Sequence, residues 1–167
     1  MKEILYTIIP WASGDILIAG PEGALSRLGF MRGRSEAELL LPFGGQCTVR
    51  KAPGFLPEVQ EQLRRYLAGE RVEWRVKIEL PYGTAFQRSV WQELQRIPWG
   101  QTSTYGELAA RLGKPQAMRA VGGANGANPV AIIIPCHRVV AAHGRLGGYS
   151  GGLEVKRALL HLEGIAL

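Results

Sequence analysis

Cysteine and histidine are scarce in this sequence, which limits the metal and disulfide chemistry open to it. There are two cysteines, Cys47 and Cys136, and three histidines, His137, His143 and His161. Two cysteines are too few for a disulfide framework, and the histidines lack the spacing of zinc ligands. We therefore expect no metal, no cofactor and a reducing compartment, the cytoplasm.

Long apolar runs are also missing. No run approaches the roughly 20 residues that a membrane-spanning helix needs, and Met1–Tyr6 lacks the basic region and long apolar core of a secretion signal. Hydrophobic residues make up 46% and charged residues 20% of the 167 residues, which is typical of a globular protein with a buried core. We expect no membrane partner and a monomer.

Acidic residues are scarce in the second half of the chain. Residues 1–80 hold 11 Lys/Arg and 10 Asp/Glu, whereas residues 81–167 hold 9 and 4. A basic half suits an anionic partner, and nucleic acid is the leading candidate. A basic surface that only keeps the protein soluble would give the same counts, so charge leaves both interpretations open.

The first half has the pattern of a sheet with one helix. β-forming residues between Gly, Pro and Asp turns predict strands over 4–9, 16–19 and 25–31. An apolar stripe at helical spacing predicts a helix over 57–67, and alternation over 72–80 predicts a half-buried strand. Loop signals dominate 32–54. Cys47 has no base near it in sequence, and we interpret it as structural.

The second half has the pattern of capped helices. Thr84 is a candidate N-cap for an amphipathic helix that runs to Ile97. Thr104 and Glu107 have the spacing of a capping box at the start of the next helix. A further helix from Pro115 completes a helix-turn-helix pattern. A pair of helices packed in a core would have the same pattern.

Small residues dominate the helix that follows Pro115. They include Ala117, Ala120, Gly122, Gly123 and Ala124. A smooth helix can approach a phosphate backbone closely, and Arg119, its long side chain, could fill a gap in a base stack. Tight packing against a neighbouring helix is the alternative explanation.

A cysteine and a histidine lie side by side between two apolar runs, 130–134 and 139–140. Pro135 cannot donate a ladder hydrogen bond, so a strand should end or bend there. A base beside Cys136 favours the thiolate, which is the nucleophilic form. By itself the Cys136-His137 pair is weak support, because a buried structural cysteine beside a surface histidine has the same sequence.

The end of the chain contains a glycine-dense loop, 143–152, and an amphipathic helix, 153–164. The loop could present backbone N–H groups to a flat ligand, or it could be a flexible surface loop. Glu163 lies at the C-terminal end of the helix, where the dipole disfavours an anion. It is therefore either exposed or held by a partner, and His137 is a candidate.

From about Gly83 to Gly164 the chain resembles the O6-alkylguanine-DNA alkyltransferases, or methylated-DNA–protein-cysteine methyltransferases. The motifs that carry the resemblance are Pro135-Cys136-His137-Arg138-Val139, Arg119-Ala120-Val121-Gly122-Gly123-Ala124, Asn128-Pro129 and Gly147-Gly148-Tyr149-Ser150-Gly151-Gly152. The resemblance implies an α+β fold. Residues 1–80 would form a ribonuclease-H-like α/β sheet domain, and residues 81–167 a helical DNA-binding and alkyltransferase domain with a winged helix-turn-helix-like motif.

The resemblance also implies roles for individual residues. Cys136 would be the nucleophile, and His137 would take its proton through a water. Glu163 would hold the imidazole, and Tyr105 would donate a hydrogen bond to the departing guanine. Asn128 would brace the turn before the nucleophile.

Further roles concern the substrate, which would be double-stranded DNA carrying O6-alkylguanine, with O4-alkylthymine as a second candidate lesion. Tyr149 and Ser150 would line the base pocket, and the Val139 carbonyl would accept from the exocyclic amine of guanine. Arg119 would enter the duplex. The helix surface against the DNA would include Ala117, Ala120, Gly122 and Gly123.

The chemistry agrees with these implied roles. An alkyl group on O6 lies inside a base pair, so the base must be extruded into a pocket. The thioether product has no easy leaving path, which predicts a single turnover. Inactive relatives carry tryptophan in place of Cys136, and the zinc ligands of some members are absent here. A cysteine hydrolase and a non-catalytic DNA-binding module remain the competing hypotheses.

Overall fold

The computed structural model of the protein describes residues 1–167. Two units follow one another along the chain, Met1–Tyr82 and Gly83–Leu167. We expected a boundary between residues 80 and 81. None of the helices is long and apolar enough to cross a membrane.

A mixed four-stranded sheet forms the framework of the first unit. Its strands, in order across the sheet, are β4 (Arg27–Phe30), β2 (Ile16–Gly20), β1 (Lys2–Ile9) and β5 (Cys47–Lys51). The β4–β2 and β2–β1 pairs are antiparallel, and β1 pairs with β5 in parallel. Every residue of β2 is buried, so both faces of the sheet are covered at its centre.

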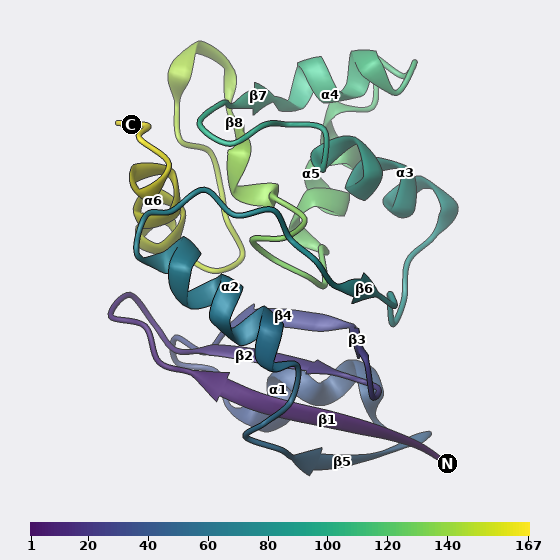
Figure 1. Cartoon of the computed structure of the whole chain (residues 1–167). Coiled ribbons are helices and arrows are strands. Elements are labelled where there is room, and N and C mark those ends of the chain that lie inside the picture. The colour runs from purple at the N-terminus through teal and green to yellow at the C-terminus, as the bar shows by residue number, and fades with distance from the viewer. The chain divides into compact units, whose positions relative to one another are not determined.

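Helices cover the sheet of the first unit. They are α1 (Glu36–Leu40), the 3-10 turn η1 (Leu41–Phe43) and α2 (Pro57–Leu67). Leu39 and Phe43 pack with Leu17 of β2 in one apolar cluster. In Figure 1, α2 passes in front of the sheet and α1 lies behind it. Leu63 and Tyr66 of α2 are almost fully buried.

The prediction of a strand over 72–80, made from the alternation of apolar and polar residues, is wrong. Only β6 (Lys77–Ile78) pairs, with β3 (Ala24–Leu25). The side chain of Gln62 donates to the Glu73 carbonyl and accepts from the Arg75 N–H. A side chain thus satisfies backbone groups that a strand partner would otherwise need to satisfy.

Two further predictions for the first unit need correction. The segment 32–54 contains a helix and a strand besides loops, because Ser35 caps α1 and β5 adds to the edge of the sheet. The strand predicted over 25–31 is divided into β3 and β4 at Ser26, whose N–H donates to the Ala19 carbonyl. The predictions for 4–9, 16–19 and 57–67 are confirmed within two residues at each end.

The second unit contains four helices and a short two-stranded ribbon. Its elements are α3 (Ala85–Leu94), β7 (Ser103–Thr104), α4 (Tyr105–Arg111), α5 (Met118–Gly126), η2 (Cys136–Arg138), β8 (Val139–Val140), η3 (Ala142–Gly144) and α6 (Leu153–Leu162). The predicted capping residues Thr84 and Thr104 each form a complete capping box. Trp91 of α3 is buried and donates its indole N–H to the Ala124 carbonyl of α5 at 2.8 Å. A mixed sheet followed by helices is the α+β class that we predicted.

Helix α5 begins later than predicted. It starts at Met118 rather than at Pro115, because the chain first turns and the Ala117 N–H bonds to the Lys114 carbonyl. It also includes Asn125 and ends at Gly126. Helices α4 and α5 pack against each other, as both a helix-turn-helix and a packed helix pair require, so the helix-turn-helix motif stays a prediction.

Residues 130–134 are buried, but they do not form the predicted strand. Ile132 has a left-handed backbone, with a φ of 70°, and the Ile134 N–H bonds to the Val130 carbonyl within the same loop. The apolar run is therefore a compact buried turn that leads into η2.

Candidate active site

Asn128 shapes the segment that carries the cysteine. Its Oδ1 accepts from the Val130 N–H at 3.0 Å, and its Nδ2 donates to the Ile134 carbonyl at 2.7 Å. The side chain thus spans the turn and satisfies both backbone groups inside the protein. Every residue from Asn128 to Val140 is buried, so Cys136 lies on a rigid support, as the bracing role predicted for Asn128 requires.

The thiol of Cys136 is itself buried, with 3% of the residue exposed. Its Sγ lies 3.8 Å from the Tyr149 hydroxyl, and its carbonyl accepts from Nδ2 of Asn125 at 3.4 Å. Burial raises the pKa of the Cys136 thiol, against the opposing influence of Asn128, Tyr149 and Lys156. A thiol with a raised pKa is protonated at neutral pH, so its use as a nucleophile requires a base.

His137 provides an imidazole next to this thiol. It is fully buried, and its Nε2 lies 2.6 Å from Oε2 of Glu163. Burial lowers the pKa of His137 more than Glu163 raises it, so the ring is neutral at neutral pH and can accept a proton. Glu163 is therefore not exposed at the end of its helix but held by a partner, His137, as the second of our two alternatives predicted.

Arg138 also binds Glu163, which we did not predict. Its Nε donates to Oε1 at 2.8 Å and its Nη2 to Oε2 at 3.2 Å, while Nη1 donates to the Ile97 carbonyl at 2.7 Å. The Gly100 N–H donates to Oε1 at 3.2 Å. These donors explain how a carboxylate is kept, 5% exposed, at the C-terminal end of a helix.

Lys156 is the second residue near the thiol that sequence reasoning missed. It is fully buried on α6, and its Nζ donates to the carbonyls of Val139 at 2.6 Å and Gly148 at 3.1 Å. Burial lowers its pKa to about 8, and Cys136 acts in the opposite direction. The Val139 carbonyl, which we assigned to the guanine amine, thus already accepts one hydrogen bond from a buried side chain.

Tyr105 is placed by the ribbon and by two glycines. Strand β7, which ends one residue before Tyr105, pairs in parallel with β8, which follows the Cys136 turn. A Cβ on Gly122 would lie 3.9 Å from the tyrosine ring, and one on Gly147 would lie 3.5 Å from it. Burial raises the pKa of Tyr105, and the neighbouring Cys136 raises it further, so its hydroxyl remains a hydrogen-bond donor.

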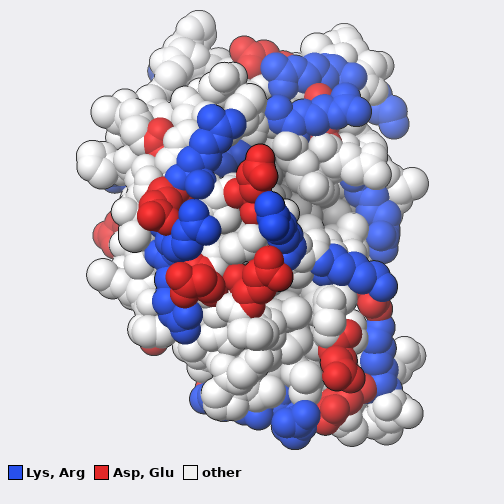
Figure 2. All heavy atoms as spheres, in the orientation of Figure 1, with Lys and Arg blue, Asp and Glu red and all other residues white.

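Helix α5 presents the predicted small-residue surface. Arg119, Ala120 and Gly123 are exposed, and Ala117 and Gly122 are half-buried. Val121 and Ala124 pack inward. Figure 2 shows basic side chains with few acidic ones over the part of this unit where Figure 1 places α4. A smooth helix beside positive charge suits a nucleic-acid backbone.

Comparison with known proteins identifies the family. Residues 85–165 match the family described as 6-O-methylguanine DNA methyltransferase, DNA binding domain. The chain is 46% identical over 159 residues to the methylated-DNA–protein-cysteine methyltransferase of Methanosarcina acetivorans, across 95% of this chain and 97% of the relative. The chain belongs to the methylated-DNA–protein-cysteine methyltransferase family.

Further relatives of this family match along nearly the whole chain. The enzyme of Haemophilus influenzae is 43% identical over 166 residues, covering 99% of this chain and 89% of the relative. The Mycobacterium tuberculosis O6-methylguanine methyltransferase superimposes with a TM-score of 0.83 at 44% identity, covering 96% of this chain and 92% of the other. The M. tuberculosis OGT in complex with DNA gives a TM-score of 0.83 at 43% identity, covering 95% and 92%. The predicted family and α+β fold are thereby confirmed; the ribonuclease-H-like and winged details stay predictions.

The two residues that we missed had signals in the sequence. Arg138 belongs to the family motif around Cys136. Lys156 lies three and four residues before Leu159 and Leu160, on the apolar face of the predicted terminal helix, where a charge needs a partner. Ser150, by contrast, is exposed on the glycine loop, and Tyr149 is half-buried there.

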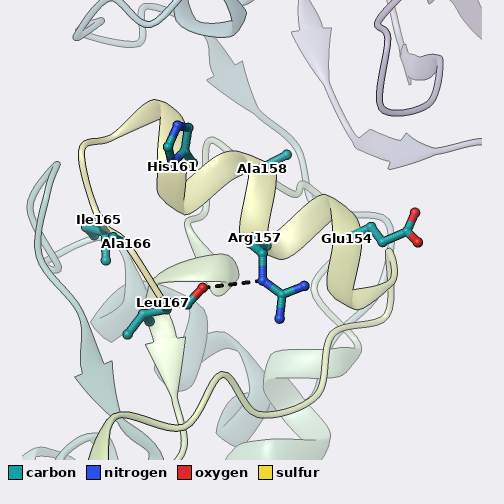
Figure 3. Close-up of a pocket in the computed structure, with 7 residues that line it drawn as sticks. All are labelled: Glu154, Arg157, Ala158, His161, Ile165, Ala166 and Leu167. Atoms are coloured by element: carbon teal, nitrogen blue, oxygen red, sulfur yellow. Dashed lines mark hydrogen bonds between the residues drawn. The ribbon is translucent and has the colours of Figure 1, made fainter.

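A separate hollow of about 620 Å³ lies along α6. Figure 3 shows its lining, which consists of Glu154, Arg157, Ala158, His161, Ile165, Ala166 and Leu167. Arg157 donates to the Leu167 carbonyl at 3.3 Å. None of the predicted site residues of the family lines it. No group of three or more His, Cys, Asp or Glu side chains is placed to hold a metal ion.

Proposed function

We propose that the protein reverses alkylation damage in DNA by moving the alkyl group from O6 of guanine to Cys136, once per molecule. The observation that carries the proposal is the buried Cys136 beside a neutral His137 that Glu163 holds at 2.6 Å. Family relatives of 43–46% identity over nearly the whole chain are named methylated-DNA–protein-cysteine methyltransferases, which supports the same chemistry here.

The chemical step begins with proton transfer from Cys136 to His137 through a water. The thiolate then attacks the alkyl carbon, so that an S–C bond forms while the C–O6 bond breaks and its electron pair moves to the guanine. The hydroxyl of Tyr105 donates a hydrogen bond to the departing base and stabilises its growing charge. Because the thioether is stable, the protein is consumed.

Residues 81–167 form the DNA-binding and alkyltransferase domain in this proposal. The lesion leaves the base stack, and Arg119 enters the space that it vacates while α5 lies against the duplex. Tyr149, Ser150 and the Val139 carbonyl line the pocket that receives the base. Binding should weaken as salt rises, because phosphate contacts release counterions. The protein works as a monomer in the cytoplasm.

The test uses a duplex carrying O6-methylguanine and intact-mass analysis of the protein. The expected product is the protein plus one methyl group, located on the peptide that contains Cys136. Cys136→Ala should abolish transfer and retain DNA binding, whereas Cys47→Ala, the matched control, should react as the wild type does. A methyl group on Cys47, or no mass gain, would refute the proposal.

The same experiment separates the competing functions. A non-catalytic DNA-binding module would bind the lesion duplex without any mass gain, and Cys136→Ala would change nothing. A cysteine hydrolase would turn over repeatedly on an ester or peptide without DNA. The adjacent Cys136 and His137 argue against a hydrolase, since the known signatures place these two residues far apart in sequence.

A further inference from the structure

Two arginines of the first unit have charged side chains without a partner. Arg27 lies on β4 and is half-buried, and its Nε is buried without a hydrogen-bond partner. Arg34 lies just before α1 and is also half-buried, and its side chain forms neither a hydrogen bond nor an ion pair. Buried polar groups in native proteins are nearly always paired, because leaving them unpaired costs free energy. The two cations therefore need an explanation that the folded chain itself does not supply.

The guanidinium of Arg27 lies over Gly29, two residues further along the same strand. A Cβ added to Gly29 would lie 3.5 Å from Nη2 of Arg27 and 3.0 Å from Cδ2 of Leu39. The charged group thus lies close to Leu39, a fully buried residue of α1. Apolar surroundings remove part of the water that would otherwise stabilise the charge, and burial accordingly lowers the pKa of Arg27.

Arg34 and Tyr82 lie close to the same guanidinium. Strand β6 pairs with β3, and the Glu79 N–H donates to the Leu25 carbonyl, so the end of the first unit runs beside the segment that leads to Arg27. Burial raises the pKa of Tyr82, and the charges of Arg27 and Arg34 lower it. The charge of Arg34 also acts on Arg27. Two guanidinium groups and one hydroxyl therefore lie within electrostatic reach of one another.

Two carboxylates of the same unit that could neutralise the arginines bind other side chains. Glu36 of α1 accepts from the Tyr6 hydroxyl at 2.5 Å and from Nζ of Lys51 at 3.4 Å. Glu79 forms an ion pair with Lys2. The two guanidinium charges repel each other, and the repulsion is stronger where water is partly excluded. An anion bound between them would remove this repulsion and would supply acceptors for the unpaired N–H groups.

We propose that Arg27, Arg34 and Tyr82 form a binding site on the first unit for a phosphate-type anion. The planar fork of a guanidinium matches two phosphoryl oxygens with parallel N–H donors, and the tyrosine hydroxyl adds a further donor. The phosphoryl group comes either from the DNA backbone or from a free phosphate ion. A DNA source would add a backbone contact outside residues 81–167 and rests on the proposed function, whereas a free ion does not.

The first arm of the test uses inorganic phosphate and the thermal melting of the full chain. Phosphate should raise the melting temperature of the wild type above its value in chloride of equal ionic strength. The rise should be about 3–6 °C when phosphate exceeds its dissociation constant tenfold. Arg27→Met and Arg34→Gln should lose this rise. Arg71→Gln removes an exposed arginine of the same unit, so it makes the same change in net charge and should keep the rise.

The second arm measures binding to a short undamaged duplex at increasing sodium chloride. Each lost phosphate contact should reduce the slope of log K against log salt by about 0.9. The slopes of Arg27→Met and Arg34→Gln should therefore be smaller than that of Arg71→Gln. An effect in this arm alone assigns the site to the DNA backbone, and an effect in the phosphate arm alone assigns it to a free ion.

Two results would overturn the proposal. In the first, neither arm separates Arg27→Met and Arg34→Gln from Arg71→Gln, so that the arginines contribute only to the overall charge. In the second, both variants fail to fold, so that the two cations are structural. Methyl transfer from the lesion duplex to Cys136 is measured on the same proteins in a separate assay. Since the phosphate arm needs neither DNA nor the thiol, failure of the anion site is distinct from failure of the proposed repair reaction.

Discussion

Replacing Lys156 by methionine should remove a pH dependence from the stability of the second unit. Burial lowers the pKa of this lysine from 10.5 to about 8. Between these two values the unfolded chain binds a proton that the folded chain does not. Below pH 8 the charged lysine therefore lowers the free energy of unfolding by its full amount. This destabilisation disappears as the pH rises to 10.5.

The size of the effect follows from the shift. Each pH unit in this window should add about 1.4 kcal/mol to the free energy of unfolding of the lysine protein relative to the methionine variant, or roughly 3 kcal/mol in total. Methionine is similar in length and keeps the core filled. The carbonyls of Val139 and Gly148 lose a donor, at about 1–3 kcal/mol each, but this offset does not change with pH.

The assay is urea denaturation at half-unit steps from about pH 7 to pH 11. Both proteins carry Cys136→Ala, because the thiol interacts electrostatically with Lys156 and would contribute its own pH dependence. Phenylalanine replaces Trp11 and Trp74, so that fluorescence reports the second unit. Lys114→Met, at an exposed lysine, is the matched control, and its free energy of unfolding should run parallel with pH to that of the protein with both lysines. If the curve of Lys156→Met ran parallel to that of the protein with the lysine, a lowered pKa for this buried side chain would be refuted.

Three further predictions concern DNA binding, capping and backbone strain. Arg119→Ala should reduce repair of a lesion duplex more than reaction with free O6-benzylguanine, since only the duplex must be opened; equal losses in a mass assay would contradict the role of Arg119. Thr104→Ala should cost about 1 kcal/mol in urea denaturation through loss of the α4 cap, whereas Thr104→Ser should cost much less. Gly83→Ala should destabilise the protein by more than about 1–3 kcal/mol, because the φ of Gly83 is 132° and the added Cβ would lie 2.6 Å from Trp91. Gly113→Ala, where φ is 72° and the space around the added Cβ is open, should cost less. Equal melting temperatures of the two variants would contradict the predicted clash with Trp91.

Helices with local signals could be predicted from the sequence. The apolar stripes and the threonine caps at Thr84 and Thr104 depend on residues within one or two turns, so tertiary context did not override them. The strand over 72–80 failed because alternation does not reveal whether a pairing strand exists. Gln62, distant in sequence, supplied the hydrogen bonds instead.

The candidate site was predictable in its residues but not in its electrostatics. Cys136, His137 and Asn128 lie within one motif, and Glu163 stood out because the helix dipole disfavours it. The two buried cations were harder to find. From sequence alone, Arg138 and Lys156 are expected to be exposed to solvent. Only the fold places the Glu163 carboxylate against Arg138. It likewise places the carbonyls of Val139 and Gly148 against Lys156.

The parallel ribbon of β7 and β8 has a consequence for how such proteins can vary. Ser103 pairs with Val139 and Thr104 with Val140, so Tyr105 and Cys136 are aligned by strand register rather than by the 30 residues that separate them in sequence. Those residues, which include α4 and α5, form an insert between two paired anchors. Changes in length at the tip of this insert would alter the surface offered to DNA and leave the reacting pair aligned. The part that chooses the target and the part that performs the chemistry can therefore change independently.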